Sequence, residues 1–361
     1  MSHSQKKILI DLERLRYPNT GLANVFKNLA KGLLNIPSSI DFSYFGTAKT
    51  IRQISPTLKV VPYKHWHRFY EPFSEQFDVI HSSNQGSLYF RKNYRHTQKI
   101  LTLHDLNFLY EDISKHKFKK TLALVNANLK NTDYLVCISN FVKDDVLKNA
   151  FLLQLDKVKE IVVIHNGITF PEEKVYPLNG ALAFLKARKY LLNIGVLFAK
   201  KNQKSLIEAL PYIEEDLVLV SSENKGSYTT ELKERITQLG LEQRVHFFSH
   251  ISEEEKNALL QHCQALCQPS LAEGFGIPPI EAMAFGKAVF LSRYTSLPEI
   301  GGDEAFYFDS FDPQVMATTI KEGLAAYYQQ EPLRSTRLKA WAAQYNYCTM
   351  AQNYLDLYNR I

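Results

Sequence analysis

Cysteine is scarce in this chain and gives little support to a metal site. The 361 residues contain four cysteines, of which only Cys263 and Cys267 lie close together. A single C-x3-C pair without a second pair is poor evidence for zinc, so small buried residues are the simpler interpretation. This use of cysteine is typical of a reducing cytoplasm.

Long apolar runs are also missing. The N-terminus has a basic start, but its apolar run covers only residues 8–10, which is too short for the core of a signal peptide. The longest nearly apolar window, residues 190–199, is far below the ~20 residues of a membrane-spanning helix. We therefore expect no membrane span. An apolar content of 45% and a charged content of 22% are those of a soluble globular protein.

Charge is unevenly distributed along the chain, whose formal net charge is +6. Residues 1–170 carry 24 Lys and Arg against 14 Asp and Glu, whereas residues 171–361 carry 19 against 23. A basic first half favours an anionic partner, such as a membrane surface, an acidic or phosphorylated acceptor, or nucleic acid. A solvated surface is the plain alternative. The chain has no nucleic-acid-binding motif, so no nucleic-acid partner is expected.

Short runs rich in β-branched residues alternate with longer amphipathic stretches through the first 170 residues. A helix is predicted at residues 23–35, and strands are predicted at residues 6–13, 40–45, 58–63, 77–83, 98–105, 133–139 and 159–167. This alternation predicts a parallel sheet with helices on both faces.

The same alternation of predicted strands and helices begins again after the Pro- and Gly-containing stretch at residues 171–181, which is typical of a linker. Strands are predicted at residues 189–195, 216–222, 244–250, 265–270, 288–292 and 304–309, and helices at 205–213, 229–240, 252–263 and from Pro278. We expect two doubly wound, Rossmann-like α/β domains that face each other across a cleft, with ligands beyond the C-terminal strand ends. The predicted divisions are a domain at 1–170, a linker at 171–187, a domain at 188–345 and a last helix at 346–361.

Two glutamates, Glu273 and Glu281, stand eight residues apart in a run that is otherwise apolar, Gly or Pro. Gly and Pro cost ~1 and ~3 kcal/mol in helix interiors, so one continuous helix cannot carry both carboxylates. The residues predict a strand, a Gly-rich loop that carries Glu273, and a helix with Glu281 near its first turn. Free N–H groups and the positive end of a helix dipole then lie between the carboxylates and suit a phosphate or sugar hydroxyls. A glycosidase-type acid/base pair is the rival interpretation.

Together with the adjacent lysines Lys200 and Lys201, this segment resembles the family 4 glycosyltransferases, retaining enzymes of the GT-B fold that use nucleotide-sugar donors. The match runs over residues 265–309 and includes E-x7-E, the GFG loop, EAMAFG and LPE. Other segments resemble the family in order, namely Gly195 with KKN at 200–202, NTGLAN at 19–24, TLHD at 102–105, residues 137–146 and IHNGI at 164–168. The chain departs at Ala23, where the family's glycine loop usually has a second Gly.

The resemblance implies roles for the second half of the chain. The leaving diphosphate would be stabilised by Lys200, Lys201 and backbone N–H groups, which come from Gly21 and from Gly274, Phe275, Gly276 and Ile277. Glu281 is expected at the ribose hydroxyls, Glu273 at the sugar ring and Glu299 at the nucleotide, although Glu299 also suits a helix cap. Arg293 and Ser296 are further candidates for nucleotide or sugar contacts. The chain contains no D-x-D sequence, so neither a metal nor a cofactor other than the donor is expected.

The first half supplies candidates for the sugar and the acceptor. His104 ends an apolar strand, where a lone histidine is usually structural, but its TLHD context implies a place near the sugar or acceptor. There it would hold and polarise a hydroxyl, and we therefore count it with Glu273 and Lys201 as catalytic. Asp105, His81 and Asn84 are weaker candidates for the same region.

Cations and aromatic residues are mixed in residues 63–73 and 89–96. Such segments suit either a peripheral contact with an anionic membrane or an anionic acceptor. Core aromatics beside solvated charges are the plain alternative.

The expected function is retaining hexosyl transfer to a saccharide or lipid-linked saccharide, such as a lipopolysaccharide precursor, in the cytoplasm or at the inner membrane face. Loops like NTGLAN with TLHD occur in mannosyltransferase-like members, which favours GDP-mannose over UDP-hexoses. A hydrolysing nucleotide-sugar epimerase shares the architecture and stays an alternative. A third alternative is a non-catalytic protein that only binds a nucleotide sugar. The presence of Glu273, His104 and both lysines in one chain argues against it. The family also implies that the last helix crosses back onto the first domain.

Overall fold

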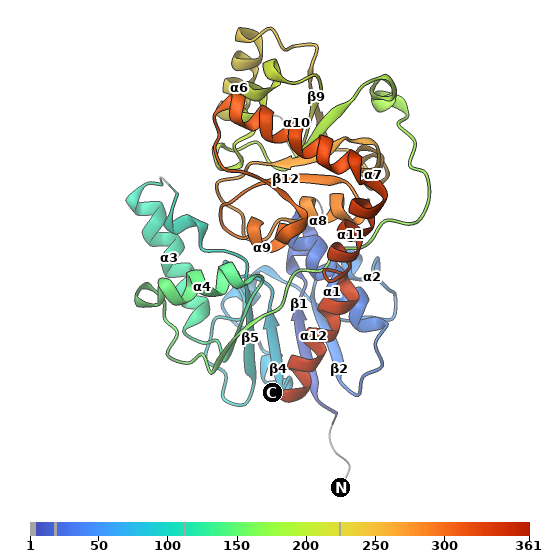
Figure 1. Cartoon of the computed structure of the whole chain (residues 1–361). Coiled ribbons are helices and arrows are strands. Elements are labelled where there is room, and N and C mark those ends of the chain that lie inside the picture. Colours follow the sequence, from blue (N-terminus) through green and yellow to red (C-terminus); the bar gives the residue numbers. More distant parts are fainter. Residues whose placement is uncertain (1–4, 18–19, 112, 224) are drawn as a thin grey trace. The chain divides into compact units, whose positions relative to one another are not determined.

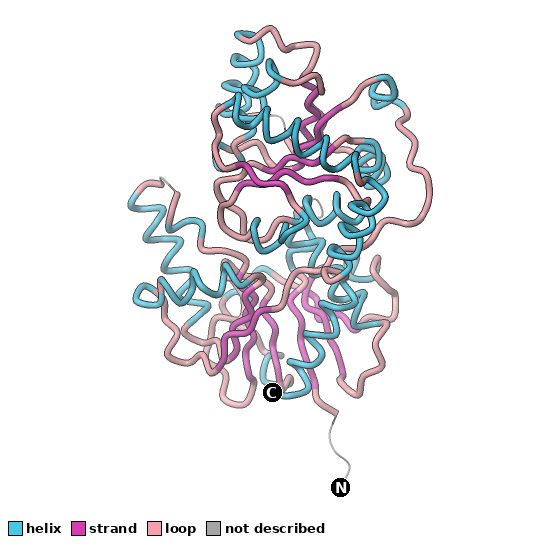
Figure 2. The backbone as a smooth tube through the Cα atoms, in the orientation of Figure 1, coloured by secondary structure: helices cyan, strands magenta, loops and turns pink. Residues whose placement is uncertain are grey.

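The computed structural model describes residues 5–17, 20–111, 113–223 and 225–361 and divides into two compact units (Figure 1). Unit 1 comprises Met1–Thr169 and Tyr345–Ile361, and unit 2 comprises Phe170–Gln344. Each unit is built around one parallel sheet, as the alternation of strands and helices predicts (Figure 2).

The sheet of unit 1 has seven strands in the order β3-β2-β1-β4-β5-β6-β7, and every neighbouring pair is parallel. The order reverses at β1 and β4, which places a topological switch point at the carboxyl ends of these strands. The strands are β1 (Lys7–Asp11), β2 (Asp41–Gly46), β3 (Lys59–Pro62), β4 (Val79–Ser82), β5 (Gln98–Leu103), β6 (Tyr134–Cys137) and β7 (Glu160–Val163).

Helices connect these strands, and the first of them begins at a side-chain cap. The Oγ1 atom of Thr20 accepts a hydrogen bond from the Ala23 N–H, so α1 starts at Gly21, two residues before the predicted start. The helices of unit 1 are α1 (Gly21–Leu34), α2 (Ala48–Arg52), α3 (Lys115–Leu129), α4 (Asn140–Lys148) and α12 (Tyr347–Arg360). Short 3-10 turns are η1 (Glu13–Arg16), η2 (His65–Arg68), η3 (Ser74–Gln76), η4 (Asn107–Leu109) and η5 (Ala150–Leu152).

The sheet of unit 2 has six parallel strands in the order β10-β9-β8-β11-β12-β13. Its switch point lies between β8 and β11. The chain after β8 leads to Lys200 and Lys201 (the lysine loop), and the chain after β11 carries Glu273 (the Glu273 loop). The strands are β8 (Tyr190–Ile194), β9 (Asp216–Ser221), β10 (Val245–Ser249), β11 (Ala265–Gln268), β12 (Ala288–Ser292) and β13 (Phe306–Phe308).

The helices of unit 2 include the short α8, which carries Glu281. They are α5 (Gln203–Ala209), α6 (Ser227–Gln238), α7 (Glu253–His262), α8 (Ile277–Ala284), α9 (Leu297–Gly301), α10 (Pro313–Gln329) and α11 (Glu331–Ala343). The 3-10 turns are η6 (Gly180–Ala187), η7 (Ala199–Lys201), η8 (Leu210–Tyr212) and η9 (Gly302–Glu304).

The C-terminal helix α12 belongs to unit 1 and packs along α1 (Figure 1). Gly32 makes this close approach possible, because a Cβ atom there would lie 2.4 Å from the Cβ of Ala351. The chain enters α12 through a bridge between Ile168 and Asn346. The expected return of the last helix onto the first domain is therefore present.

The stretch predicted as a linker, residues 171–187, is instead part of unit 2. Leu182 and Leu185 of η6 are each 1% exposed, and Tyr176 and Leu178 are also buried. The Pro and Gly residues of this stretch prevent a regular helix, but its apolar side chains still pack into the unit.

The two basic and aromatic segments differ in exposure. In residues 89–96, Tyr89, Phe90 and Tyr94 are buried in a cluster with Leu9 and Phe45, so these aromatics are core residues. In residues 63–73 several aromatic side chains are instead exposed, namely Trp66, Phe69 and Tyr70. Tyr63 and Phe73, at the two ends of the first segment, pack against the same cluster. The interpretation as core aromatics therefore holds for residues 89–96 and for Tyr63 and Phe73, but not for Trp66, Phe69 and Tyr70.

In the described part of the chain, no helix is both long and apolar enough to cross a membrane.

Candidate active site

The loop between β11 and α8 carries Glu273, and a glycine shapes its end. Gly276 precedes α8 with a φ of 114°, a conformation that side chains with a Cβ rarely adopt. A Cβ atom at this position would also lie 3.0 Å from Leu297. Two prolines follow in the first turn of α8, where a missing N–H breaks no helical hydrogen bond. The strand, loop and helix are those that the sequence predicts.

One oxygen of Glu273 is the meeting point of three donors. Its Oε1 atom lies 2.6 Å from Lys201 Nζ and accepts hydrogen bonds from the side chains of Gln268 at 3.0 Å and Ser270 at 2.9 Å. The Glu273 N–H donates to Thr295 Oγ1 at 2.9 Å. The side chains of Lys201 and Glu273 are each 13% exposed, so water screens this ion pair only weakly. The structure thus joins two residues that the sequence nominates separately.

The lysine loop and the Glu273 loop are also connected through their backbones. Lys200 and Lys201 lie in η7, and the Lys200 carbonyl accepts a 2.7 Å hydrogen bond from the Leu271 N–H. Asn202 ends the turn with a φ of 53° and leads directly into α5. Lys200, Lys201 and Glu273 therefore form one local constellation at the carboxyl ends of β8 and β11.

Glu281 is the fifth residue of α8, just past its first turn. Its Oε1 atom lies 2.8 Å from Nζ of Lys256, which comes from α7. Burial raises the pKa of Glu281, and the Lys256 ammonium opposes this rise. No sequence pattern identifies Lys256, because it stands among ordinary surface residues of an amphipathic helix.

The segment after β12 supports the Glu273 loop from the other side. Ser296 is completely buried, and its hydroxyl donates to the Phe275 carbonyl at 2.7 Å. The prediction that Ser296 contacts nucleotide or sugar is therefore wrong, because burial leaves its hydroxyl no access to a ligand. Arg293, the other candidate here, pairs with Asp309. Glu299 is the third residue of α9, a position that also suits a helix cap.

Phe275 and Ile277 place backbone groups at the start of α8. Phe275 is 4% exposed, so its aromatic ring packs inside unit 2. Gly274, Gly276 and Ile277 continue this backbone into the first turn of the helix. Their N–H groups lie at the positive end of the α8 dipole, which favours an anion.

In unit 1, His104 directly follows β5 and is tied to a neighbouring loop. Its Nε2 atom lies 2.9 Å from the Ser83 carbonyl, which can only accept, so Nε2 carries the proton and Nδ1 the lone pair. Its backbone N–H donates to Gln85 Oε1 at 3.1 Å. Burial lowers the pKa of His104, although the Ser83 carbonyl and Asp105 counteract the shift. The shift favours the neutral form of the imidazole.

Gln85 holds the backbone on both sides of His104, a role that no sequence pattern signals. Its Oε1 accepts from the His104 N–H, and its Nε2 donates to the Asp105 carbonyl at 2.9 Å. The Asp105 side chain caps the following turn by accepting from the Asn107 N–H at 3.0 Å. Gln85 and Asp105 together fix the loop after β5.

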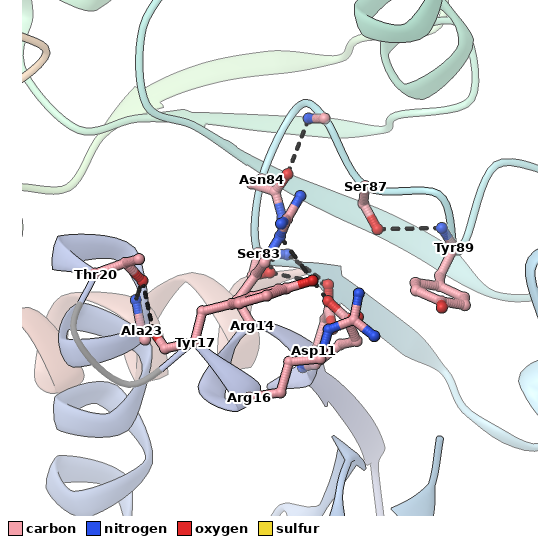
Figure 3. Close-up of polar contacts among 12 residues, drawn as sticks. Asp11, Arg14, Arg16, Tyr17, Thr20, Ala23, Ser83, Asn84, Ser87 and Tyr89 are labelled. Atoms are coloured by element: carbon pink, nitrogen blue, oxygen red, sulfur yellow. Dashed lines mark hydrogen bonds and ion pairs between the residues drawn. The ribbon is translucent and has the colours of Figure 1, made fainter. Parts of the chain in front are cut away.

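Asn84 and Ser83 lie beside a buried aspartate (Figure 3). Asp11 Oδ2 accepts the Ser83 hydroxyl at 2.9 Å, and Asn84 donates to the same hydroxyl oxygen at 3.2 Å. Burial raises the pKa of Asp11. Asn84 is only 5% exposed and its Oδ1 accepts from the Gly86 N–H, so it shapes this loop more than it faces a ligand.

His81, predicted to contact the sugar or acceptor, is in the core, and that prediction is wrong. The side chain is completely buried, and burial lowers its pKa to about 3. Its Nδ1 hydrogen-bonds Tyr358 and its Nε2 hydrogen-bonds Thr102, each at 2.7 Å. Thr102 in turn contacts the Tyr354 hydroxyl at 2.9 Å. Because both tyrosines belong to α12, His81 anchors the C-terminal helix.

Gly21 is the first residue of α1, and its chain neighbours Thr20 and Leu22 line a pocket of about 290 Å³ together with Arg14 and Tyr17. Figure 3 shows Arg14, Tyr17 and Thr20. The neighbouring Ala23 is 1% exposed, so its methyl group packs inside the unit. Asn19 of the predicted glycine loop lies outside the described residues. Arg14 adds a cation after β1 that no sequence pattern identifies.

Across residues 5–17, 20–111, 113–223 and 225–361, no group of three or more His, Cys, Asp or Glu side chains is arranged to hold a metal ion. The metal-independent mechanism stays a prediction.

Comparison with known proteins gives matches in both units. Residues 180–336 match the family model of the glycosyl transferases group 1, and residues 44–170 match that of glycosyltransferase family 4. The O-antigen chain mannosyltransferase RfbU of Salmonella typhimurium is 27% identical over 70% of this chain and 67% of its own length. The O-antigen chain mannosyltransferase B of Escherichia coli is 22% identical over 88% of this chain and 90% of its own length.

A solved structure has the same fold. Anabaena HepE in complex with UDP and glucose superimposes with a TM-score of 0.71 over 99% of this chain and 100% of its own. Its 19% identity supports the fold alone. With family matches in both units, two Rossmann-like parallel sheets and a helix that returns to the first unit, this chain belongs to the family 4 glycosyltransferases of the GT-B fold.

Proposed function

We propose that this enzyme is a retaining mannosyltransferase that moves mannose from GDP-mannose to a saccharide acceptor of a cell-surface glycan, such as a lipopolysaccharide precursor or a lipid-linked oligosaccharide. The observation that carries the chemistry is the ion pair between Lys201 and Glu273 at the loop that opens α8. The sugar and the glycan class are supported by the two O-antigen mannosyltransferases among the relatives.

The first requirement of this reaction is to stabilise the negative charge that develops on the leaving diphosphate. We assign Lys200, Lys201 and the N–H groups from Gly274 to Ile277 to this charge, as preorganised positive groups. Gly21, the first residue of α1, is assigned to the same diphosphate through its N–H group. In this proposal these groups take the part that a metal ion plays in metal-dependent transferases, and the reaction needs no further cofactor.

Orientation of the donor is the second demand. We assign Glu281 to the ribose hydroxyls, Glu299 to the nucleotide and Glu273 to the hydroxyls of the sugar ring. Because Lys201, Gln268 and Ser270 all hold Oε1 of Glu273, the carboxylate is fixed before the donor arrives. Such a fixed carboxylate supports the positive charge that develops on the sugar as its bond to phosphate breaks.

His104 is assigned to a hydroxyl of the sugar or acceptor. Since Nε2 donates to Ser83, the lone pair on Nδ1 is the group that can accept a hydrogen bond from a hydroxyl. The neutral ring polarises that hydroxyl without holding a full charge. Asp105 and Asn84 shape the surrounding loops.

Donor hydrolysis followed by NMR tests the reaction type without knowledge of the acceptor. With GDP-mannose alone, a retaining transferase slowly releases mannose whose first-formed anomer has the configuration of the donor. An epimerised sugar would instead favour a nucleotide-sugar epimerase, and release of the opposite anomer would contradict retention.

Two substitutions test the role of each glutamate. Glu281→Ala is expected to weaken donor binding, whereas Glu273→Ala is expected to lower turnover more than binding. The reverse pattern would contradict the assignment of these two residues.

A UDP-hexose is the second candidate donor. It is favoured by the similarity to HepE, which was crystallised with UDP and glucose. Competition between GDP and UDP for the same protein separates the two donors.

We also propose that the enzyme works on the cytoplasmic side and touches the membrane peripherally through residues 64–70. Phe69 is 79% exposed, Tyr70 64% and Trp66 46%, and the cations of Lys64 and Arg68 lie over the Trp66 and Phe69 rings. Exposed aromatics beside cations suit the interface of an anionic bilayer.

Liposome flotation tests this contact. Replacement of Trp66 and Phe69 by serine is expected to reduce binding to anionic liposomes at low salt, whereas Phe151→Ser, at an 82% exposed aromatic of the same unit, is not. If the wild-type protein does not bind such liposomes, the membrane proposal is wrong while the transferase proposal stands.

A further inference from the structure

A lysine from another helix holds Glu281, and the roles assigned above make no use of it. Lys256 Nζ lies 2.8 Å from Glu281 Oε1 and 2.9 Å from Glu253 Oε2. The side chains of Lys256 and Glu281 are 17% and 18% exposed, whereas that of Glu253 is 76% exposed. The contact with Glu281 is therefore the shielded one, and solvent screens mainly the contact with Glu253.

The ion pair occupies only one oxygen of the Glu281 carboxylate. Within the described ranges, the hydrogen bond and ion pair of Glu281 both join Lys256 to Oε1, and Oε2 has no protein partner. Fixing one oxygen orients the other, so the carboxylate is preorganised to accept hydrogen bonds from a ligand.

Each partner favours the charged form of the other. Burial raises the pKa of Glu281, and the Lys256 charge is the largest influence that lowers it again. Burial alone would lower the pKa of Lys256, but Glu281 and Glu253 raise it above its ordinary value. Glu253 slightly opposes the ionisation of Glu281. The elements that pack against α8 carry further titratable groups, namely Glu254, Glu255 and His262 on α7, Cys267 on β11, Glu299 on α9, and Glu331, Arg334, Arg337 and Lys339 on α11.

We propose that Lys256 is a positioning residue for the donor, which presents Glu281 as an oriented, ionised carboxylate to the ribose hydroxyls of a nucleoside diphosphate. This inference rests on the proposed function, in which Glu281 binds the ribose. Lys256 acts through Glu281 and does not itself touch the ligand. An ionised carboxylate accepts hydrogen bonds from both hydroxyls of a diol, whereas a protonated one has less accepting capacity.

Calorimetric titration with GDP and with UDP, from about pH 5 to pH 8, tests the proposal. Lys256→Met keeps the length of the side chain but removes its charge, and we expect it to weaken nucleotide binding about tenfold at pH 7. Without the ammonium, the pKa of Glu281 rises further. As the pH is lowered, nucleotide binding should therefore weaken at a higher pH in the variant than in the wild type. Lys256→Arg should restore both the affinity and the pH profile.

Lys174→Met is the matched control. Lys174 also pairs with two glutamates, one of them Glu254 of α7 at 3.0 Å, but its side chain is 41% exposed and does not reach Glu281. Its substitution should leave both the affinity and the pH profile unchanged.

A double-mutant cycle separates positioning from a general structural role. In a Glu281→Gln background, Lys256→Met should no longer weaken GDP or UDP binding, because the group through which it acts has lost its charge. If Lys256→Met weakens binding equally in both backgrounds, or binds with wild-type affinity and pH profile, the inference is wrong. Should Lys256→Met fail to fold, Lys256→Gln provides the same comparison without the charge. If the wild-type protein binds neither nucleotide, the inference and the proposed function are both overturned.

Discussion

Removal of the Lys201 charge is the perturbation whose effect the structure defines best. Lys201 Nζ contacts Glu273 Oε1 at 2.6 Å, and that oxygen also accepts from Gln268 and Ser270. In Lys201→Met these two neutral donors remain, so Glu273 should keep its place while its positive partner is lost. The variant therefore tests charge at this site more than loop geometry.

The magnitude follows from two effects. A hydrogen bond between charged groups contributes about 1.5–3 kcal/mol, which in a unit of this size corresponds to a Tm decrease of roughly 3–12 °C. Loss of one preorganised donor to a developing charge typically costs ~10²–10³ in rate. We therefore expect a folded, moderately destabilised enzyme with a far larger loss of turnover than of stability.

Steady-state kinetics and thermal melts measure both quantities. Lys204→Met is the control, since Lys204 also forms an ion pair, 2.7 Å from Glu231, but with side chains 40% and 49% exposed. Exposed pairs are worth only ~0–1 kcal/mol, and this variant should turn over donor at the wild-type rate. If Lys201→Met lost no more activity than Lys204→Met, the electrostatic reasoning would be refuted.

Three further predictions concern other parts of the molecule. Gln85→Ala should lower kcat by a larger factor than it raises KM, because the loop that carries His104 loses two hydrogen bonds. Changes of equal size in kcat and KM would instead indicate a misfolded loop. Gly276→Ala should cost about 1–3 kcal/mol in chemical denaturation, since alanine is strained at a φ of 114°, and an unchanged midpoint would contradict this. His81 has a folded-state pKa of about 3, below its unfolded value, so its contribution to stability is present above about pH 6.5 and is lost as pH falls toward 3, by about 1.4 kcal/mol per pH unit. His81→Gln should reduce this slope in denaturation curves measured at several pH values.

The strands and the Glu273 loop could be predicted because local rules determine them. Gly and Pro between Glu273 and Glu281 forbid a helix there, and the pattern of apolar runs distinguishes strands from helices. The nearness of Lys201 to Glu273 follows from a different rule: in a parallel sheet the loops after adjacent strands meet at one edge. The sequence alone identifies Lys201 and Glu273 as candidates, but it does not show that Lys201 contacts Oε1 of Glu273.

The errors arise where distant segments cover one another. His81 lies near a strand end and looks available to a ligand, but α12 returns from the other end of the chain and buries it. For residues 89–96 the sequence leaves two interpretations open, and packing decides between them: Tyr89, Phe90 and Tyr94 lie in the core with Leu9 and Phe45. The contact between Lys256 and Glu281 could not be predicted for the same reason, because only the packing of α7 on α8 brings the two side chains together.

The most direct test of the central claim is a thermal-shift panel of GDP- and UDP-sugars on the wild-type protein. A donor present at about 100 times its Kd should stabilise the fold by ~2.7 kcal/mol. We predict that GDP-mannose gives a saturable increase in Tm and that Glu281→Ala reduces it. Absence of stabilisation by every nucleotide sugar in the panel would contradict the assignment of this chain as a nucleotide-sugar-dependent transferase.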